Sequence, residues 1–243
     1  MRLATTPQDR TMWYDTLPND KSWGALWNGY IICGCCRAIR RVENLCPVCG
    51  DEAPGGQQSV VHVVDGKEIV VANCCFMGAE GRYEDWVYLQ LMEREWKRPV
   101  LESDHLPGFS PGDGPSLRAS IVVLFWSYFE TRIERLLRGG LAEIPGRILE
   151  DVLRRYSSIG ARMNDFYRIA FGSTYKEDLE AVGYGQVWAH LSKVQERRNL
   201  FAHGQPQAID DHLVQSTVEM VNLEHEARIA VFNKRAARTA SKK

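Results

Sequence analysis

The sequence predicts a mainly α-helical protein in which a helical bundle follows a small α+β module. Two Cys-x-x-Cys pairs and a run of β-branched residues lie in the first part of the chain, whereas no convincing strand occurs after residue 116. Between the two parts, residues 99–116 contain four prolines and three glycines, a composition typical of linkers or long ordered loops. We therefore predict an α+β module at 1–98, a linker at 99–116, a helical bundle at 117–235 and a basic tail at 236–243.

The composition is that of an ordinary globular protein without a strong electrostatic field. The chain has 243 residues, of which 44% are hydrophobic and 25% are charged, and its formal net charge is −1. Any binding of nucleic acid must therefore depend on local patches of charge. Neither a run of about 18 apolar residues nor an apolar N-terminal signal segment occurs, so we expect a cytoplasmic protein that does not span a membrane.

Five of the seven cysteines lie within seventeen positions. Cys33 and Cys36 form one Cys-x-x-Cys pair, and Cys46 and Cys49 form a second, whose Cys-Pro-Val-Cys-Gly sequence resembles the knuckle of zinc ribbons. Four thiolates complete a tetrahedral zinc site and leave no open position, so a zinc ion here is predicted to be structural. Cys35 is an alternative ligand of the first pair, and a redox dithiol or a disulfide is the alternative chemistry.

The rest of the first module is predicted to contain a β-hairpin and a helix. Residues 59–72 consist of two β-branched runs separated by Asp65-Gly66, a strong hairpin pattern. Residues 83–97 carry large apolar side chains at steps of three and four, which predicts a helix. Three arginines lie between the cysteine pairs, and they fit a phosphate contact and a solvated hairpin tip equally well: Arg37, Arg40 and Arg41.

Helical periodicity continues through the second module. The first segment contains residues 121–129, which are apolar nearly all round and are expected at the centre of the bundle. Gly139-Gly140 is expected to end this helix. The predicted helical segments are 117–138, 145–156, 164–171, 176–182, 187–203 and 208–232.

The segment 187–203 carries the most distinctive chemistry. Its apolar stripe is interrupted by Arg198. Burying a guanidinium on a packed face costs free energy unless the group is paired with a carboxylate or has a functional role. His203 follows, and Gly204 and Pro206 predict that the helix ends there. If His203 is the unwound last residue of the helix, its imidazole can turn back toward Arg198. An imidazole transfers protons near neutral pH and a guanidinium clamps phosphate, so the pair suits phosphoryl chemistry. The alternative is a surface arginine beside a histidine that favours the helix dipole.

The sequence Arg198-Asn199-Leu200-Phe201-Ala202-His203 resembles the signature of HEPN domains, in which an Arg, a polar residue and a nearby His lie late in a helical bundle. The resemblance covers residues 117–235. It implies a metal-independent endoribonuclease in which a ribose 2′-hydroxyl attacks the adjacent phosphate and leaves a 2′,3′-cyclic phosphate and a 5′-hydroxyl. By this resemblance His203 would move the protons, Arg198 would hold the phosphate and Asn199 would position the pair. Glu130 would orient His203 or Arg198.

The resemblance also implies a homodimer in which two such motifs line one cleft. RNA would be the substrate, the chain would act as a toxin or antiviral-defence effector, and a protein inhibitor or antitoxin could restrain it. Gln205 stands where one HEPN subgroup carries a tyrosine that is modified, so regulation of that type is not expected. The alternative function is a non-catalytic dimeric module that binds RNA, a nucleotide or a protein partner through its zinc module.

Overall fold

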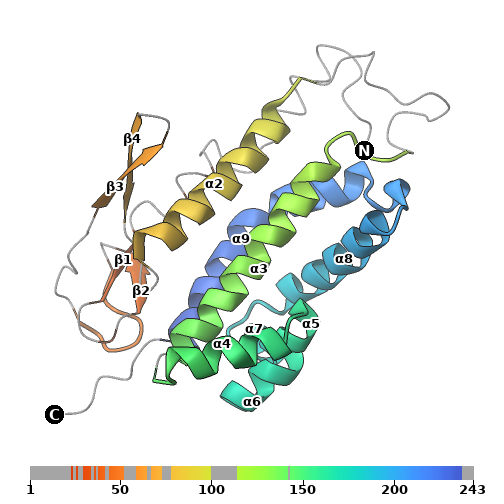
Figure 1. Ribbon diagram of the computed structural model, residues 1–243. Coiled ribbons are helices and arrows are strands. Elements are labelled where there is room, and N and C mark those ends of the chain that lie inside the picture. Colours follow the sequence, from red (N-terminus) through yellow and green to blue (C-terminus); the bar gives the residue numbers. More distant parts are fainter. Residues whose placement is uncertain are drawn as a thin grey trace. The chain divides into compact units, whose positions relative to one another are not determined.

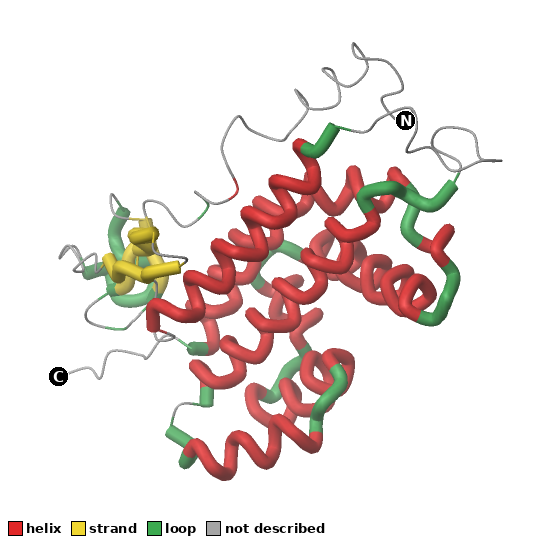
Figure 2. The backbone as a smooth tube through the Cα atoms, turned by 45° about the horizontal axis from the view of Figure 1, so that its top comes forward, coloured by secondary structure: helices red, strands yellow, loops and turns green. Residues whose placement is uncertain are grey.

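The structure is a computed structural model that describes residues 23, 26, 30–33, 36, 38–41, 44–51, 59–64, 67–72, 78–99, 114–141 and 143–236. The predicted basic tail, most of the predicted linker, Cys35 and Arg37 lie outside these residues. Within them the protein is mainly helical, as the sequence predicts (Figure 2). No helix in this part of the chain has the length and hydropathy needed to cross a membrane.

The strands form two separate antiparallel pairs. β3 (Ser59–Val64) and β4 (Lys67–Ala72) pair from Ser59 opposite Ala72 to Val64 opposite Lys67, which confirms the predicted hairpin. β1 (Tyr30–Ile32) and β2 (Ile39–Arg41) form a second, shorter pair that the sequence analysis did not predict.

The helices agree with the predicted segments to within a few residues at most ends. The predicted piece at 164–171 is part of a longer helical stretch that passes through a π-helical turn, and the side chain of Ser158 caps the start of this stretch. The helices are α2 (Gly78–Lys97), α3 (Ala119–Gly140), α4 (Gly146–Arg155), α5 (Ile159–Ala161), π-helix η4 (Arg162–Phe166), α6 (Tyr167–Phe171), α7 (Tyr175–Ala181), α8 (Gly185–Ala202), 3-10 helix η5 (Pro206–Ala208) and α9 (Asp211–Arg235).

The chain divides into two compact units, each built from three segments. Unit 1 comprises Met1–Ala25, Val87–Phe129 and Gln186–His225. Unit 2 comprises Leu26–Trp86, Glu130–Gly185 and Glu226–Lys243. Helices α2, α3 and α9 contribute residues to both units.

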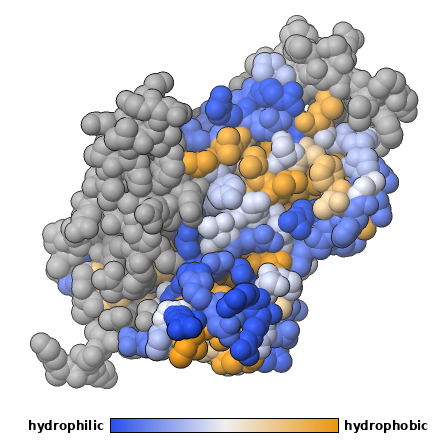
Figure 3. All heavy atoms as spheres, in the orientation of Figure 1, coloured by the Kyte–Doolittle hydropathy of each residue, from blue (hydrophilic) through white to orange (hydrophobic). Residues whose placement is uncertain are grey.

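The core of unit 1 is formed by parts of α2, α3, α8 and α9, which lie side by side (Figure 1). Ile121, Phe125 and Phe129 of α3 are fully buried, which confirms that this apolar stretch is central. Val187 and Val194 of α8 are also fully buried. On the face drawn in Figure 3, hydrophobic side chains gather over the first half of α3.

Unit 2 contains a buried carboxylate that joins three helices. Asp178 of α7, whose side chain is 1% exposed, accepts hydrogen bonds from the Tyr167 hydroxyl (2.6 Å), the Ser173 hydroxyl (3.1 Å), the Lys234 ammonium (2.9 Å) and the Arg235 guanidinium. Burial opposes ionisation of this carboxyl, but these donors, Arg235 first, outweigh burial and lower its pKa to about 2. The carboxylate therefore ties α6 and α7 to the C-terminal end of α9.

The two glycines at the end of α3 lie against aromatic rings. The helix ends at Gly140, as the Gly139-Gly140 pair predicts, but both glycines are still helical and neither takes a positive φ. A Cβ atom at Gly139 would lie 3.3 Å from the ring of Phe232, and one at Gly140 would lie 2.5 Å from the ring of Phe171. Close packing, and not a left-handed turn, is therefore the reason for glycine at these positions.

Gly140→Ala should lower the stability of unit 2. The Phe171 ring also packs on the Tyr167 ring and faces the Arg235 guanidinium, so it cannot move away freely. We expect a loss of about 1–3 kcal/mol in the free energy of unfolding, measured by urea denaturation. Gly146→Ala in α4 is the control, because its Cβ would meet no atom within 4 Å. Equal unfolding midpoints for the two variants would contradict this explanation.

Candidate functional site

Four cysteine side chains converge beside β1 and β2. Cys33 follows β1, Cys36 lies in the turn before β2, and Cys46 and Cys49 belong to the turn after β2. Their four sulfur atoms all lie within 4.8 Å of one another, with 3.5 Å between Cys33 and Cys49 and 3.4 Å between Cys36 and Cys46. A tetrahedral site with Zn–S bonds of about 2.3 Å places its sulfurs roughly 3.8 Å apart, so this cluster has the size and the donor set of such a site. The four predicted ligands therefore lie together and can hold a metal ion.

Backbone hydrogen bonds shape the two turns that present these sulfurs. Cys33 N–H donates to the Ala38 carbonyl at 2.8 Å, and Gly50 N–H donates to the Cys46 carbonyl at 2.9 Å. Gly50 has a φ of 72°, which confirms that this glycine provides the left-handed residue of the second turn.

The Cys46 thiol ionises more readily than an ordinary thiol. Burial opposes its ionisation, but backbone N–H groups of Cys49 and Val48 outweigh burial and lower its pKa to about 7. Since the thiolate is the form that binds a metal, this shift favours metal binding at Cys46, whereas burial raises the pKa of the neighbouring Cys36 thiol and opposes it there.

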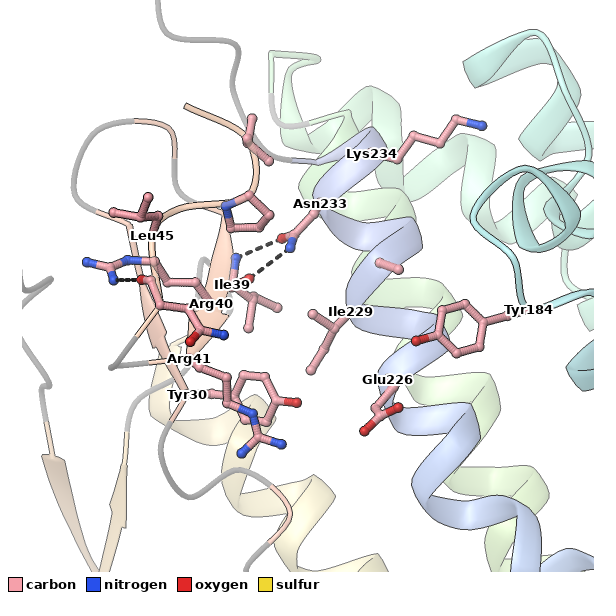
Figure 4. A pocket seen from close by; sticks show the side chains of 14 residues that line it. Tyr30, Ile39, Arg40, Arg41, Leu45, Tyr184, Glu226, Ile229, Asn233 and Lys234 are labelled. Carbon is pink, nitrogen blue, oxygen red and sulfur yellow. Dashed lines mark hydrogen bonds between the residues drawn. The ribbon is translucent and has the colours of Figure 1, made fainter. Parts of the chain in front are cut away.

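Asn233 attaches β2 to α9 inside unit 2. Its side-chain oxygen accepts from the Ile39 N–H at 2.7 Å, and its side-chain nitrogen donates to the Ile39 carbonyl at 2.8 Å (Figure 4). The amide thus pairs with both backbone groups of Ile39 in the way that a neighbouring strand would. This contact fixes the cysteine-bearing strands against the last helix.

A groove of about 710 Å³ lies beside this contact, between the cysteine-bearing segment and α9 (Figure 4). The Arg41 guanidinium carbon stacks 4.0 Å from the centre of the Tyr30 ring on one side. Tyr184 and Glu226 lie on the other side. Burial is the largest cause that raises the pKa of both phenols, and the Glu226 carboxylate raises it further.

This groove could not be predicted from the sequence. Its lining comes from residues 30–48, from Tyr184 and from residues 226–234, and no local pattern links segments so far apart. The sequence offers one indication of this groove, because Arg40 and Arg41 of its lining are two of the three arginines between the cysteine pairs that fit a phosphate contact.

The Arg198 and His203 pair lies at the end of α8. The helix ends at Ala202, His203 follows it directly, and Gly204 takes a φ of 86°, so the end predicted at His203 is confirmed to within one residue. The Arg198 side chain is half-buried and donates to the Asn199 side-chain oxygen at 3.1 Å, whereas Asn199 and His203 are exposed. Among the side chains that the structure describes, no hydrogen bond joins Arg198 to His203.

Glu130, the fourth predicted site residue, and His190, a further histidine of α8, have different surroundings. Glu130 is a half-buried residue of α3 that belongs to unit 2, whereas Arg198 and His203 belong to unit 1. His190 is buried in unit 1, with its ring 6.0 Å from that of Phe125. Burial is the main cause that lowers the pKa of His190 to about 4, and Lys193 contributes to this shift. His190 is therefore neutral at pH 7, as a buried histidine of the core would be.

No protein-family model, curated protein or solved structure matches this chain. Its chemistry is therefore interpreted from the residues themselves. Two places carry reactive groups: the cysteine cluster with its adjoining groove in unit 2, and the end of α8 in unit 1.

Proposed function

We propose that the chain is a HEPN-type, metal-independent endoribonuclease in which Arg198 and His203 cleave RNA. The observation that carries the proposal is the position of the motif at the C-terminal end of α8, directly before the turn that leads to the last helix. His203 is exposed beyond the helix end, so an RNA strand can reach its imidazole. Arg198 is close enough to the surface to contact a phosphate.

In this proposal each residue has a separate part in one transesterification. His203 takes the proton from the ribose 2′-hydroxyl and returns a proton to the departing 5′-oxygen. The 2′-oxygen bonds to phosphorus while the 5′-oxygen leaves, which gives a 2′,3′-cyclic phosphate and a 5′-hydroxyl. Arg198 binds the phosphate and stabilises the charge that builds on it. The 3.1 Å hydrogen bond from Arg198 supports a positioning role for Asn199, and Glu130 is proposed to orient His203 or Arg198.

The proposal includes a homodimer that brings two such motifs to one cleft. Hydrophobic side chains over the first half of α3 support it (Figure 3). A hollow of about 670 Å³ at α2 and α3 has a mainly polar and charged lining, in which Leu91, which is 41% exposed, and Leu124 are the apolar residues. We further propose that the protein acts in the cytoplasm as a toxin or antiviral-defence effector restrained by a protein inhibitor or antitoxin.

The metal of the cysteine cluster has a structural part in this proposal. Four thiolates satisfy a tetrahedral zinc ion and leave it no position for water or substrate, so zinc would fold the segment that contains Cys33, Cys36, Cys46 and Cys49. The cleavage step itself needs only residues of the helical bundle.

His203→Ala should reduce RNA cleavage by at least about a hundredfold, since general acid–base groups contribute at least this much to catalysis. Cleavage of total RNA by the purified protein would be compared with that of the variant, and the ends would be tested for cyclic phosphate. His212→Ala is the matched control, because His212 is also an exposed histidine next to a helix end. Equal cleavage by wild type and His203→Ala, or no cleavage by either, would overturn the catalytic assignment.

The same experiment detects the alternative, a dimeric module that binds RNA without cutting it. The groove beside the cysteine cluster is the observation that favours this alternative. Dimer formation and RNA binding without any cyclic-phosphate product would support it. Under this alternative neither wild type nor Arg198→Ala would cleave RNA, and the substitution would change RNA binding or the stability of the protein instead.

A further inference from the structure

We propose that the groove between β2, the Cys46–Cys49 turn and α9 binds a guanine nucleotide, either free or as part of single-stranded RNA. Only the RNA form rests on the proposed nuclease function. The recognition chemistry is the same for both sources, because each presents a guanine base with a nearby phosphate.

The size and charge of the groove favour an anionic ligand of this kind. A volume of about 710 Å³ lies within the roughly 300–1,000 Å³ typical of small-molecule sites. Among the residues that the structure describes, the lining contains Arg40, Arg41 and Lys234 but a single carboxylate, Glu226, so this part of the lining is positively charged in a chain whose net charge is −1. A ligand that carries a phosphate therefore complements the groove.

Arg41 is the cation best placed to hold the phosphate. Lys234 already pairs with Asp178 at 2.9 Å, and Arg40 is buried and donates to the Asn44 carbonyl. The Arg41 guanidinium lies over Tyr30 at the side of the groove that faces Glu226 (Figure 4). Stacking on the ring orients the planar group at this side of the groove, and a guanidinium in such a position binds phosphate oxygens in pairs.

Glu226 is the group that selects the base. Its side chain is exposed, and within the described chain it makes no hydrogen bond or ion pair. An ionised carboxylate has two acceptor oxygens, and guanine presents two adjacent N–H donors on its Watson–Crick edge. Adenine offers only one donor on that edge, so the carboxylate favours guanine over adenine.

The aromatic and aliphatic lining suits the flat faces of a base. Tyr184 lies beside Glu226 and is half-buried, so one face of its ring is available for stacking. Ile229 and Ala230 line the wall of the groove that α9 forms. Exposed Leu45 and Val48, which are 58% and 39% exposed, line the opposite side.

The test is calorimetric binding of GMP and AMP to the zinc-loaded protein. We expect wild type to bind GMP more tightly than AMP. Glu226→Gln should weaken GMP binding about tenfold with little change for AMP, since it replaces one acceptor oxygen by a donor. Arg41→Gln should weaken both nucleotides alike, because both carry the phosphate. Glu219→Gln is the control, an exposed glutamate of the same helix that does not line the groove.

The source of the nucleotide is resolved with a short guanine-containing oligoribonucleotide, tested on the His203→Ala background to prevent cleavage. Displacement of GMP by the oligoribonucleotide indicates RNA, and GMP binding without displacement indicates the free nucleotide. The proposal is overturned if wild type does not bind GMP, or if Glu226→Gln with a wild-type unfolding midpoint binds GMP as wild type does. A failure of the nuclease assignment would appear separately, as unchanged cleavage by His203→Ala.

Discussion

On the proposal that the cysteine cluster holds a structural zinc ion, a zinc chelator should unfold the segment from β1 to Asp51. The segment has little internal support, because β1 and β2 contain three residues each and its own buried cluster consists of Cys33, Cys36, Ala38 and Cys46. The Asn233 contact holds Ile39 of β2 to α9, but three of the four proposed ligands belong to the buried cluster itself. Structural zinc sites contribute on the order of 10 kcal/mol to the folding of small modules, far more than two short strands provide. Hydrogen exchange of residues 30–51 with and without a zinc chelator would measure the effect.

Single substitutions separate the two candidate ligand sets. Cys46→Ser should abolish stoichiometric metal binding and expose the segment to exchange even in the presence of zinc. Cys35→Ser should leave both the metal content and the exchange protection unchanged, because the four sulfurs that lie together do not require Cys35. Protection that survives chelation would show that the segment folds without a metal. Loss of metal in Cys35→Ser would show that the first pair uses Cys35.

The features that could be predicted from sequence are the ones encoded by neighbouring residues. The cysteine pairs are local, so their spacing was enough to predict which sulfurs would lie together. The hairpin at 59–72 depends on one two-residue turn, and the long helices depend on periodicity within each segment. The end of α8 was also a local signal, because Gly204 adopts the left-handed conformation that ends a helix.

Features that depend on distant segments could not be predicted in this way. Gly139 and Gly140 have the usual pattern of a helix end, yet Phe232 and Phe171 approach them from other helices and decide their role. Glu226 and Tyr184 have no signature of their own and gain a possible function only beside Arg41. The catalytic parts of Arg198, Asn199, His203 and Glu130 remain predictions, since the spacing of these residues along the chain does not determine how their side chains are arranged in space.

Asp178→Asn should cause the largest loss of stability among single substitutions in the helical part of unit 2. The variant keeps the shape of the side chain but removes the charge that Lys234 and Arg235 share, and these two cations would then face each other without a counterion. Removing one partner of a buried ion pair costs about 3 kcal/mol or more. Urea denaturation followed by circular dichroism would measure this loss. Asp151→Asn is the control, because Asp151 pairs with Arg154 and Arg155 on the surface, where such pairs contribute less than about 1 kcal/mol.

The pH dependence of the stability difference between wild type and Asp178→Asn provides a second and independent test of the Asp178 interactions. The pKa of Asp178 is about 2 in the folded protein and near 3.8 when exposed, so the folded state favours the ionised form. Its stabilisation, about 2 kcal/mol from this shift, is therefore complete above the unfolded pKa and disappears as pH falls through the folded one. The stability gap between wild type and Asp178→Asn should narrow between about pH 5 and about pH 2. A gap that stays constant over this range would mean that Asp178 stabilises the fold by packing and not by its charge.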